Sequence, residues 1–223
     1  MKELLITDLD GTLLDPNGKL SDISAEIINQ FISTGGAFTF ATARTASSAV
    51  KITEKININT PCVLMNGVSI YDIQKKKYIK NEYINNSTAV TVSDIFKQCN
   101  IKPFMYKIKN NRLFALYTGF ENKQMYEFFL LRRDKYDKSF IKCSDFACEA
   151  DDNVVYFTTL GEYESLAPVK SLLDKIDNIS SAFYKDVYNK GLWFLEVFSN
   201  RASKSNGIKF LKKYGTFDYV TCF

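Results

Sequence analysis

The sequence contains no histidine, and this absence excludes several kinds of catalysis within the chain. Ser-His-Asp and Cys-His hydrolysis, phosphohistidine chemistry and histidine-rich metal sites all need that side chain. Acid and base catalysis must therefore come from carboxylates, lysine, tyrosine or cysteine.

Cysteine pairs with the Cys-x-x-Cys spacing of zinc and redox motifs are also absent. The five cysteines are widely scattered, and their number is odd. We therefore expect small core residues or free thiols rather than a disulfide framework. They are Cys62, Cys99, Cys143, Cys148 and Cys222.

Long apolar runs are missing as well. None approaches the ~18 residues that span a bilayer, and no basic segment precedes a signal-like stretch. We expect a cytoplasmic protein that does not contact membranes. The net charge of +4 is modest, and the basic run Lys75–Lys77 lies where a turn is expected. A solvated turn is favoured over a nucleic-acid-binding patch.

The most informative segment that is present lies near the N-terminus and reads Leu4-Leu5-Ile6-Thr7-Asp8-Leu9-Asp10-Gly11-Thr12. Its apolar start predicts a strand buried on both faces, and residues two apart on a strand share a side. Asp8 and Asp10 are therefore expected to converge. Two adjacent carboxylates stay ionised together only where a cation or strong donors compensate them, which predicts a magnesium site. The alternative is an Asx-turn in a solvated loop.

Alternating strand and helix signals predict an α/β fold with a doubly wound, parallel-sheet core. With 46% hydrophobic residues, the 223-residue chain can bury a substantial core. Strands are expected near residues 3 to 9, at Ala37–Ala41 and at Cys62–Met65, and helices from Ser21 or Asp22 to Gly35 and from about Ala46 to Lys55.

The segment Asp8-Leu9-Asp10-Gly11-Thr12 resembles the first motif of the haloacid dehalogenase (HAD) superfamily, Asp-x-Asp-Gly-Thr. The resemblance implies that Asp8 attacks a phosphoryl group and that Asp10 acts as general acid and base. It also implies that Asp8 and Asp10 bind Mg²⁺, and that Gly11 and Thr12 contribute to substrate binding.

Thr42 follows the second expected strand, where its neutral hydroxyl can donate to a phosphoryl oxygen. An ordinary strand threonine is the alternative. The family's second motif is Ser or Thr, often followed by Gly-Arg. Thr42 and Arg44 match it, whereas Ala43 departs from it, and we assign all three to substrate binding.

Asn66-Gly67 resembles the Asn-Gly-Ala signature of the Cof-type, class IIB branch, which implies that Asn66 touches substrate. A plain hairpin turn is at least as well supported. Lys204 is expected in the first turn of a helix, where an ammonium group can hold a phosphoryl group beside a carboxylate. A surface lysine is the alternative. The family's third motif places a catalytic lysine there.

The pattern changes over residues 82–190, where consecutive strand signals predict an inserted α+β unit with an antiparallel sheet. It resembles the large HAD cap, so the core is assigned to residues 1–81 and 191–223. Strand signals lie at Phe104–Ile108, Leu113–Thr118, Val154–Thr159, Ala182–Val187 and Leu192–Phe198, and helical ones at Asn86–Gln98 and Tyr163–Ile176.

Tyr219–Phe223 reads as another core strand, and the family's fourth motif, Gly-Asp-x-x-x-Asn-Asp, does not follow it. We therefore expect a C-terminally truncated form with weakened metal binding and a sheet edge open to weak self-association. The resemblance implies a Mg²⁺-dependent phosphatase for a small phosphorylated metabolite, such as a sugar or cofactor phosphate. The alternatives are a phosphomutase and a non-catalytic module that binds phosphorylated ligands.

Overall fold

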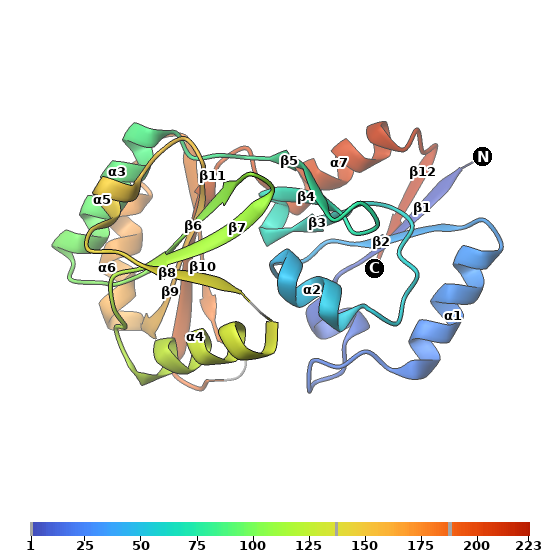
Figure 1. Cartoon of the computed structure of the whole chain (residues 1–223), viewed down its shortest axis with the longest axis horizontal. Helices are drawn as coiled ribbons and strands as arrows, with labels where there is room; N and C mark the ends of the chain where they lie inside the picture. Colours follow the sequence, from blue (N-terminus) through green and yellow to red (C-terminus); the bar gives the residue numbers. More distant parts are fainter. Residues whose placement is uncertain (1, 137, 187–188) are drawn as a thin grey trace. The chain divides into compact units, whose positions relative to one another are not determined.

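The computed structural model describes residues 2–136, 138–186 and 189–223, and the chain divides into two compact units (Figure 1). The first unit comprises Met1–Asn81 and Ala202–Phe223, and the second comprises Glu82–Arg201. The second unit therefore ends after Arg201 and not after residue 190 as expected. The reason is that β11 (Leu192–Ser199) pairs with β9 (Val154–Glu162) and β10 (Ile179–Lys185) of that unit. Val187, the last residue of one expected strand, lies outside the described residues.

A parallel sheet forms the centre of the first unit. β1 (Glu3–Thr7) lies between β12 (Tyr219–Cys222) and β2 (Ala37–Phe40), and both pairings are parallel. A parallel bridge from Ala41 to Val63 links this sheet to β3 (Cys62–Leu64). The predicted α/β fold with a parallel-sheet core is confirmed. β12 is an edge strand, while self-association through it stays a prediction.

Helices cover this sheet (Figure 1). They are α1 (Asp22–Ser33), α2 (Ala46–Ile52) and α7 (Lys204–Tyr214). α7 places Leu211 in one buried cluster with Leu4 and Ile6 of β1. The opposite face of β2 carries buried Phe38 and Phe40, and α1 packs against β2. Apolar side chains on both faces of this sheet thus form the two layers of the core.

A short antiparallel sheet completes the first unit. β3 pairs with β4 (Ser69–Asp72), and β4 pairs with β5 (Lys77–Asn81). Asn66 and Gly67 connect β3 to β4, so the predicted hairpin connection is confirmed. Residues 73–76 form the turn from β4 to β5, and Lys75 and Lys76 are exposed there, as predicted.

The second unit is built on a six-stranded sheet in the order β10-β11-β9-β6-β7-β8. Its further elements are α3 (Asn86–Gln98), β6 (Phe104–Lys109), β7 (Arg112–Tyr117), α4 (Lys123–Tyr136), β8 (Ser139–Lys142), α5 (Phe146–Glu149) and α6 (Tyr163–Leu173). The sheet is antiparallel, as predicted, except that β7 and β8 pair in parallel. α4 provides the crossover that a parallel pair needs. Its apolar residues do not form one face, so the sequence pattern gave no helix there.

Two apolar layers enclose this sheet. On one face Met105, Phe157 and Leu195 form a buried cluster with Phe96 of α3 and Leu166 of α6. On the other face the Phe104 ring stacks on Phe128 of α4, with their centroids 5.7 Å apart. In the part of the chain that the structure describes, no helix has the length and apolar character to cross a membrane.

Candidate active site

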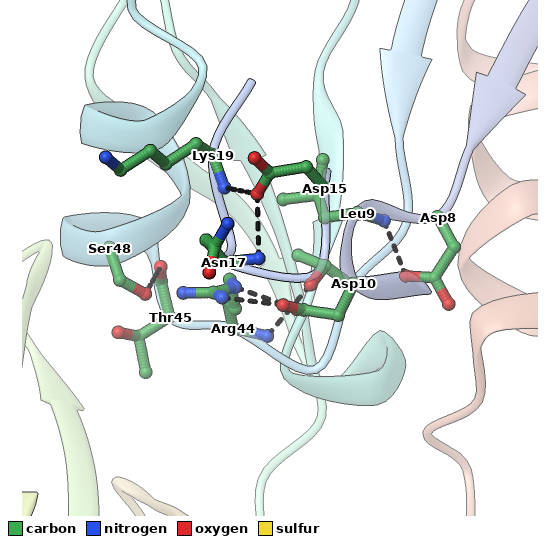
Figure 2. Close-up of polar contacts among 10 residues, drawn as sticks. Asp8, Leu9, Asp10, Asp15, Asn17, Lys19, Arg44, Thr45 and Ser48 are labelled. Atoms are coloured by element: carbon green, nitrogen blue, oxygen red, sulfur yellow. Dashed lines mark hydrogen bonds and ion pairs between the residues drawn. The ribbon is translucent and has the colours of Figure 1, made fainter. Parts of the chain in front are cut away.

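Four predicted site segments meet in the first unit, each just beyond the end of a strand or at the start of a helix. Asp8 follows β1, Thr42 follows β2, Asn66 follows β3, and Lys204 begins α7. Because the carboxyl ends of parallel strands meet at one edge of a sheet, segments far apart in the sequence lie close together there. Figure 2 shows the part of this site around Asp8, Asp10 and Arg44.

Asp8 is bound through both carboxylate oxygens. Oδ1 accepts a hydrogen bond from the Leu9 amide at 2.7 Å (Figure 2). Oδ2 accepts one from the Lys204 ammonium at 2.5 Å. The two side chains are 37% and 34% exposed, so both carboxylate and ammonium face solvent from a partly buried position. The site therefore contains a carboxylate beside an ammonium group, and a ligand in solution can reach both groups.

The start of α7 places Lys204. Ser203 is the N-cap of this helix, and its hydroxyl accepts a hydrogen bond from the Asn206 amide at 3.0 Å. The first amides of a helix attract anions, and a lysine in the first turn adds a full positive charge. The predicted helix start at Lys204 is confirmed, and so is its closeness to the first motif.

Asp10 makes a two-bond ion pair with Arg44. Arg44 Nε donates to Oδ2 at 2.8 Å, and Nη2 donates to Oδ1 at 2.6 Å (Figure 2). The expected convergence of Asp8 and Asp10 on one side of a strand is wrong. β1 ends at Thr7, and Asp10 lies in the following turn with φ −74° and ψ 124°. The Asp8 carboxylate binds the Lys204 ammonium, whereas the Asp10 carboxylate binds the Arg44 guanidinium. Arg44 and Lys204 thus supply the charge compensation that adjacent carboxylates need.

Thr42 is fully buried, with 0% of its surface exposed. Its hydroxyl oxygen accepts a hydrogen bond from the Arg44 amide at 3.2 Å, which leaves its proton for another acceptor. Ala43 is exposed, and its φ is not positive, so alanine brings no backbone strain where the family often has glycine. The segment 42–44 therefore joins the Thr42 hydroxyl to the Arg44 ion pair.

The remaining predicted residues lie in turns. Gly11, with φ 78°, and Thr12 are exposed in the turn that follows Asp10. Asn66 has φ 57°, and its amide donates to the Thr42 carbonyl at 3.1 Å. The structure thus brings Asn66 to the Thr42 segment through the backbone. Whether its side chain touches substrate stays a prediction.

Two features of the site were not found by sequence reasoning. One is the pairing of Asp10 with Arg44 across 34 positions, for which no local pattern exists. The other is the left-handed backbone of Met65, with φ 50°, because the Asn-Gly signal marked only the two following residues. Burial raises the pKa of the Cys62 thiol at the start of β3, so this thiol is a poor nucleophile.

Metal ligands are few. Among residues 2–136, 138–186 and 189–223, no group of three or more acidic, cysteine or histidine side chains is placed to hold a metal ion. Each Asp8 oxygen already accepts one hydrogen bond, and a carboxylate oxygen has two lone pairs. For a metal ion, the site therefore offers the Asp8 carboxylate, and the main-chain carbonyl of Asp10 follows two residues later.

Comparison with known proteins decides the family. The family model described as haloacid dehalogenase-like hydrolase matches residues 5–219, which is nearly the whole chain. The chain belongs to the haloacid dehalogenase-like hydrolases. A member from Buchnera aphidicola subsp. Baizongia pistaciae, named "Putative phosphatase", is 27% identical over 95% of this chain and 74% of its own length.

Several solved structures share the fold of this chain. A Thermotoga maritima protein has a TM-score of 0.77 and 18% identity, over 100% of this chain and 79% of its own. A HAD subclass IIB sugar phosphatase has a TM-score of 0.65 and 14% identity, over 99% of this chain and 94% of its own. At these identities the likeness concerns the fold alone.

Proposed function

We propose that this hydrolase is a Mg²⁺-dependent phosphatase that cleaves a small phosphorylated metabolite through an aspartyl-phosphate intermediate. The observation that carries the proposal is the Asp8 carboxylate, 2.5 Å from the Lys204 ammonium and two residues before a second aspartate. A carboxylate nucleophile beside a cation suits attack on a dianionic phosphate, because the ammonium offsets the charge repulsion.

The proposed reaction has two displacements. An Asp8 oxygen attacks phosphorus while the bond to the leaving oxygen breaks, and Asp10 gives its proton to that oxygen. Asp10 then takes a proton from water, whose oxygen attacks the phosphorus of the aspartyl phosphate. Inorganic phosphate leaves and the Asp8 carboxylate is restored. Asp10 must leave its two-bond pairing with Arg44 to exchange protons, since both of its oxygens accept bonds from the guanidinium.

Lys204 and Thr42 have separate roles in this proposal. The Lys204 ammonium binds a phosphoryl oxygen and offsets the negative charge of Asp8. The Thr42 hydroxyl donates its proton to another phosphoryl oxygen, because its own oxygen already accepts from the Arg44 amide. Arg44, Asn66 and the turn of Gly11 and Thr12 bind the rest of the substrate at the rim of the site.

Magnesium fits this donor set in part. Asp8 would hold the ion through a carboxylate lone pair and Asp10 through its main-chain carbonyl, and phosphate and water would supply the remaining oxygen ligands. When bound, the ion offsets negative charge on the phosphoryl oxygens. We propose weak metal binding, since in the described residues no group of three or more acidic, cysteine or histidine side chains is placed to hold a metal ion.

The second unit, Glu82–Arg201, is proposed to act as a cap that selects the substrate. Support comes from its position as an insertion between Asn66 and Lys204, and from the fold shared with a sugar phosphatase. The substrate class is accordingly a sugar or cofactor phosphate. A cytoplasmic location also belongs to the proposal, since all five cysteines are free thiols and a reducing compartment preserves them.

The decisive experiment measures Mg²⁺-dependent phosphate release from a panel of sugar and cofactor phosphates by the 223-residue chain. Asp8→Asn should abolish release, and Asp10→Asn should lower it by about 10²-fold or more. Asp15→Asn is the matched control, because Asp15 lies in the same N-terminal segment and its side chain accepts hydrogen bonds from the amides of Asn17 and Lys19 (Figure 2). Equal activity of Asp8→Asn and Asp15→Asn would refute the proposed nucleophile.

The intermediate needs its own test. Borohydride reduces an acyl phosphate, so trapping during turnover should modify the peptide that contains Asp8 and no other. Transfer of phosphate to a second substrate hydroxyl, without release of inorganic phosphate, would instead identify a phosphomutase. Binding of phosphorylated compounds without turnover would identify a non-catalytic module.

A further inference from the structure

Three consecutive residues after β3 have left-handed backbone. Met65, Asn66 and Gly67 have φ values of 50°, 57° and 95°. Such angles are uncommon for residues with a Cβ and persist only where the surroundings hold the chain in place. Met65 is 1% exposed, so this turn is anchored by a buried side chain.

On one side the turn is bonded to the segment of the second motif. The Met65 amide donates to the Arg44 carbonyl at 3.1 Å, and the Asn66 amide donates to the Thr42 carbonyl at 3.1 Å. The Thr42 amide in turn donates to the Val63 carbonyl at 2.9 Å. Two main-chain hydrogen bonds therefore fix the turn, and a third fixes the preceding strand β3, against the segment that presents the Thr42 hydroxyl.

On its other side the turn touches the start of α7. A Cβ built on Gly67 would lie 2.1 Å from the Ser203 carbonyl oxygen and 2.2 Å from the Ser203 carbonyl carbon. Both atoms belong to the backbone, so a larger residue at this position must displace the turn or Ser203. Ser203 caps α7 and immediately precedes Lys204.

We propose that the turn Met65–Gly67 is a positioning element that sets Lys204 relative to Asp8 and Thr42, with Gly67 as its positioning residue. The proposal rests on the proposed function, in which Lys204 binds the phosphoryl group. The turn is tied to the Thr42 segment, so displacement caused by a side chain at position 67 passes to Ser203 and from there to Lys204. A misplacement of about 1 Å can lower catalysis by as much as about 10²-fold.

The chain offers a matched control. Gly35 has φ 93°, close to the value of Gly67, but a Cβ built there meets nothing within 4 Å. Gly35→Ala therefore introduces the same backbone strain without the contact to Ser203. We expect both Gly67→Ala and Gly35→Ala to lower the unfolding temperature. Only Gly67→Ala should lower kcat per folded molecule, by about tenfold or more. Equal kcat per folded molecule in the two variants would overturn the proposal.

A second pair of variants guards against a Gly67→Ala protein that does not fold. Asparagine tolerates left-handed backbone better than alanine, so Gly67→Asn and Gly35→Asn should fold more readily. The Cβ of asparagine still meets Ser203 at position 67 and nothing at position 35. The same contrast in kcat is expected, and its absence would count against positioning.

A double-mutant cycle separates positioning of Lys204 from a general loss of structure. In a Lys204→Met background, the change at Gly67 should cost less than threefold further activity, because the group that it positions is gone. Fully multiplicative losses would show that Gly67 acts independently of Lys204, and the proposal would then be wrong.

Binding of inorganic phosphate, measured by calorimetry, separates this proposal from the proposed function. Phosphate binding that is weakened by Gly67→Ala and by Lys204→Met, but not by Gly35→Ala, would support positioning even if no substrate is hydrolysed. Turnover by the wild type with no contrast between the glycine variants would leave the phosphatase standing and refute positioning. Neither turnover nor phosphate binding in the wild type would refute both.

Discussion

The Lys204 ammonium lies 2.5 Å from the Asp8 carboxylate, although 196 positions separate the two residues in the sequence. β1 delivers the carboxylate at its carboxyl end, and α7 delivers the ammonium in its first turn. Both side chains are about one-third exposed, with values of 37% and 34%. Ion pairs that solvent reaches add about 0–1 kcal/mol to stability, so this pair contributes mainly charge at the site.

Lys204→Met should therefore lower kcat/KM by about 10²-fold or more while the free energy of unfolding changes by at most about 1 kcal/mol. Lys209→Met is the matched control, because Lys209 is exposed on the same helix. Phosphate release and chemical denaturation of both variants check this prediction. A Lys204→Met protein as active as the Lys209→Met protein would show that the ammonium has no part in turnover.

Arg44→Lys should retain the charge beside Asp10 but lose the paired geometry, because an ammonium group cannot present two parallel N–H donors. We expect kcat to fall by about tenfold, since the guanidinium that is freed when Asp10 exchanges protons is proposed to hold the substrate in position. Steady-state kinetics on the best substrate would measure the change. An unaltered kcat would mean that the charge alone is sufficient at position 44.

The two serine N-caps in the first unit provide a paired stability test. Ser203 accepts from the Asn206 amide at 3.0 Å, and Ser21 accepts from the Ser24 amide at 3.0 Å. Ser203→Ala and Ser21→Ala should each reduce the free energy of unfolding by about 1 kcal/mol. Only the Ser203 variant should also lose activity, because α7 carries Lys204. If the Ser21 variant lost as much activity, the effect would reflect general destabilisation.

Lys138 of the second unit should make stability depend on pH. It is 7% exposed, and its ammonium contacts the Tyr106 hydroxyl at 3.1 Å. Burial, with a smaller effect of Arg132, holds the pKa of Lys138 well below its ordinary value of 10.5. The unfolded chain then binds the proton more tightly than the folded one, so protonation destabilises the fold at low pH. That loss is relieved as the pH rises from the folded pKa towards 10.5.

Lys138→Met removes this titration. The free energy of unfolding of the wild type, minus that of the variant, should therefore increase between about pH 7 and about pH 9. Denaturant titrations of both proteins across that range supply the difference, in which other ionisable groups cancel. A difference that stays constant or decreases with pH would contradict a buried amine with a lowered pKa.

Much of this fold could be predicted because its signals are local. Apolar runs identified β1, β2 and β3, and the helical signal at Asn86–Gln98 matches the observed bounds of α3. α4 was missed because its apolar side chains are spread around the helix. Some of them pack on Phe104, and others are exposed to solvent. Without α4 the parallel pairing of β7 with β8 could not be predicted.

The site was predicted as a set of residues but not as a set of contacts. Motif order brought Asp8, Thr42 and Lys204 together correctly, because strand ends of a parallel sheet converge. The partner of Asp10 was not predicted, since the turn after Thr7 depends on the tertiary packing of Leu9, which is fully buried. Periodicity of a strand cannot indicate where that strand ends.

The pairing of β1 with β12 also bears on synthesis of the chain. Glu3 lies opposite Tyr219, so β1 lacks one neighbour until β12, far later in the sequence, has been translated. Residues 82–201 are contiguous and are complete 18 residues before Tyr219 is added. We expect this middle unit to fold during translation, while the N-terminal strands remain a partly assembled sheet that chaperones can recognise.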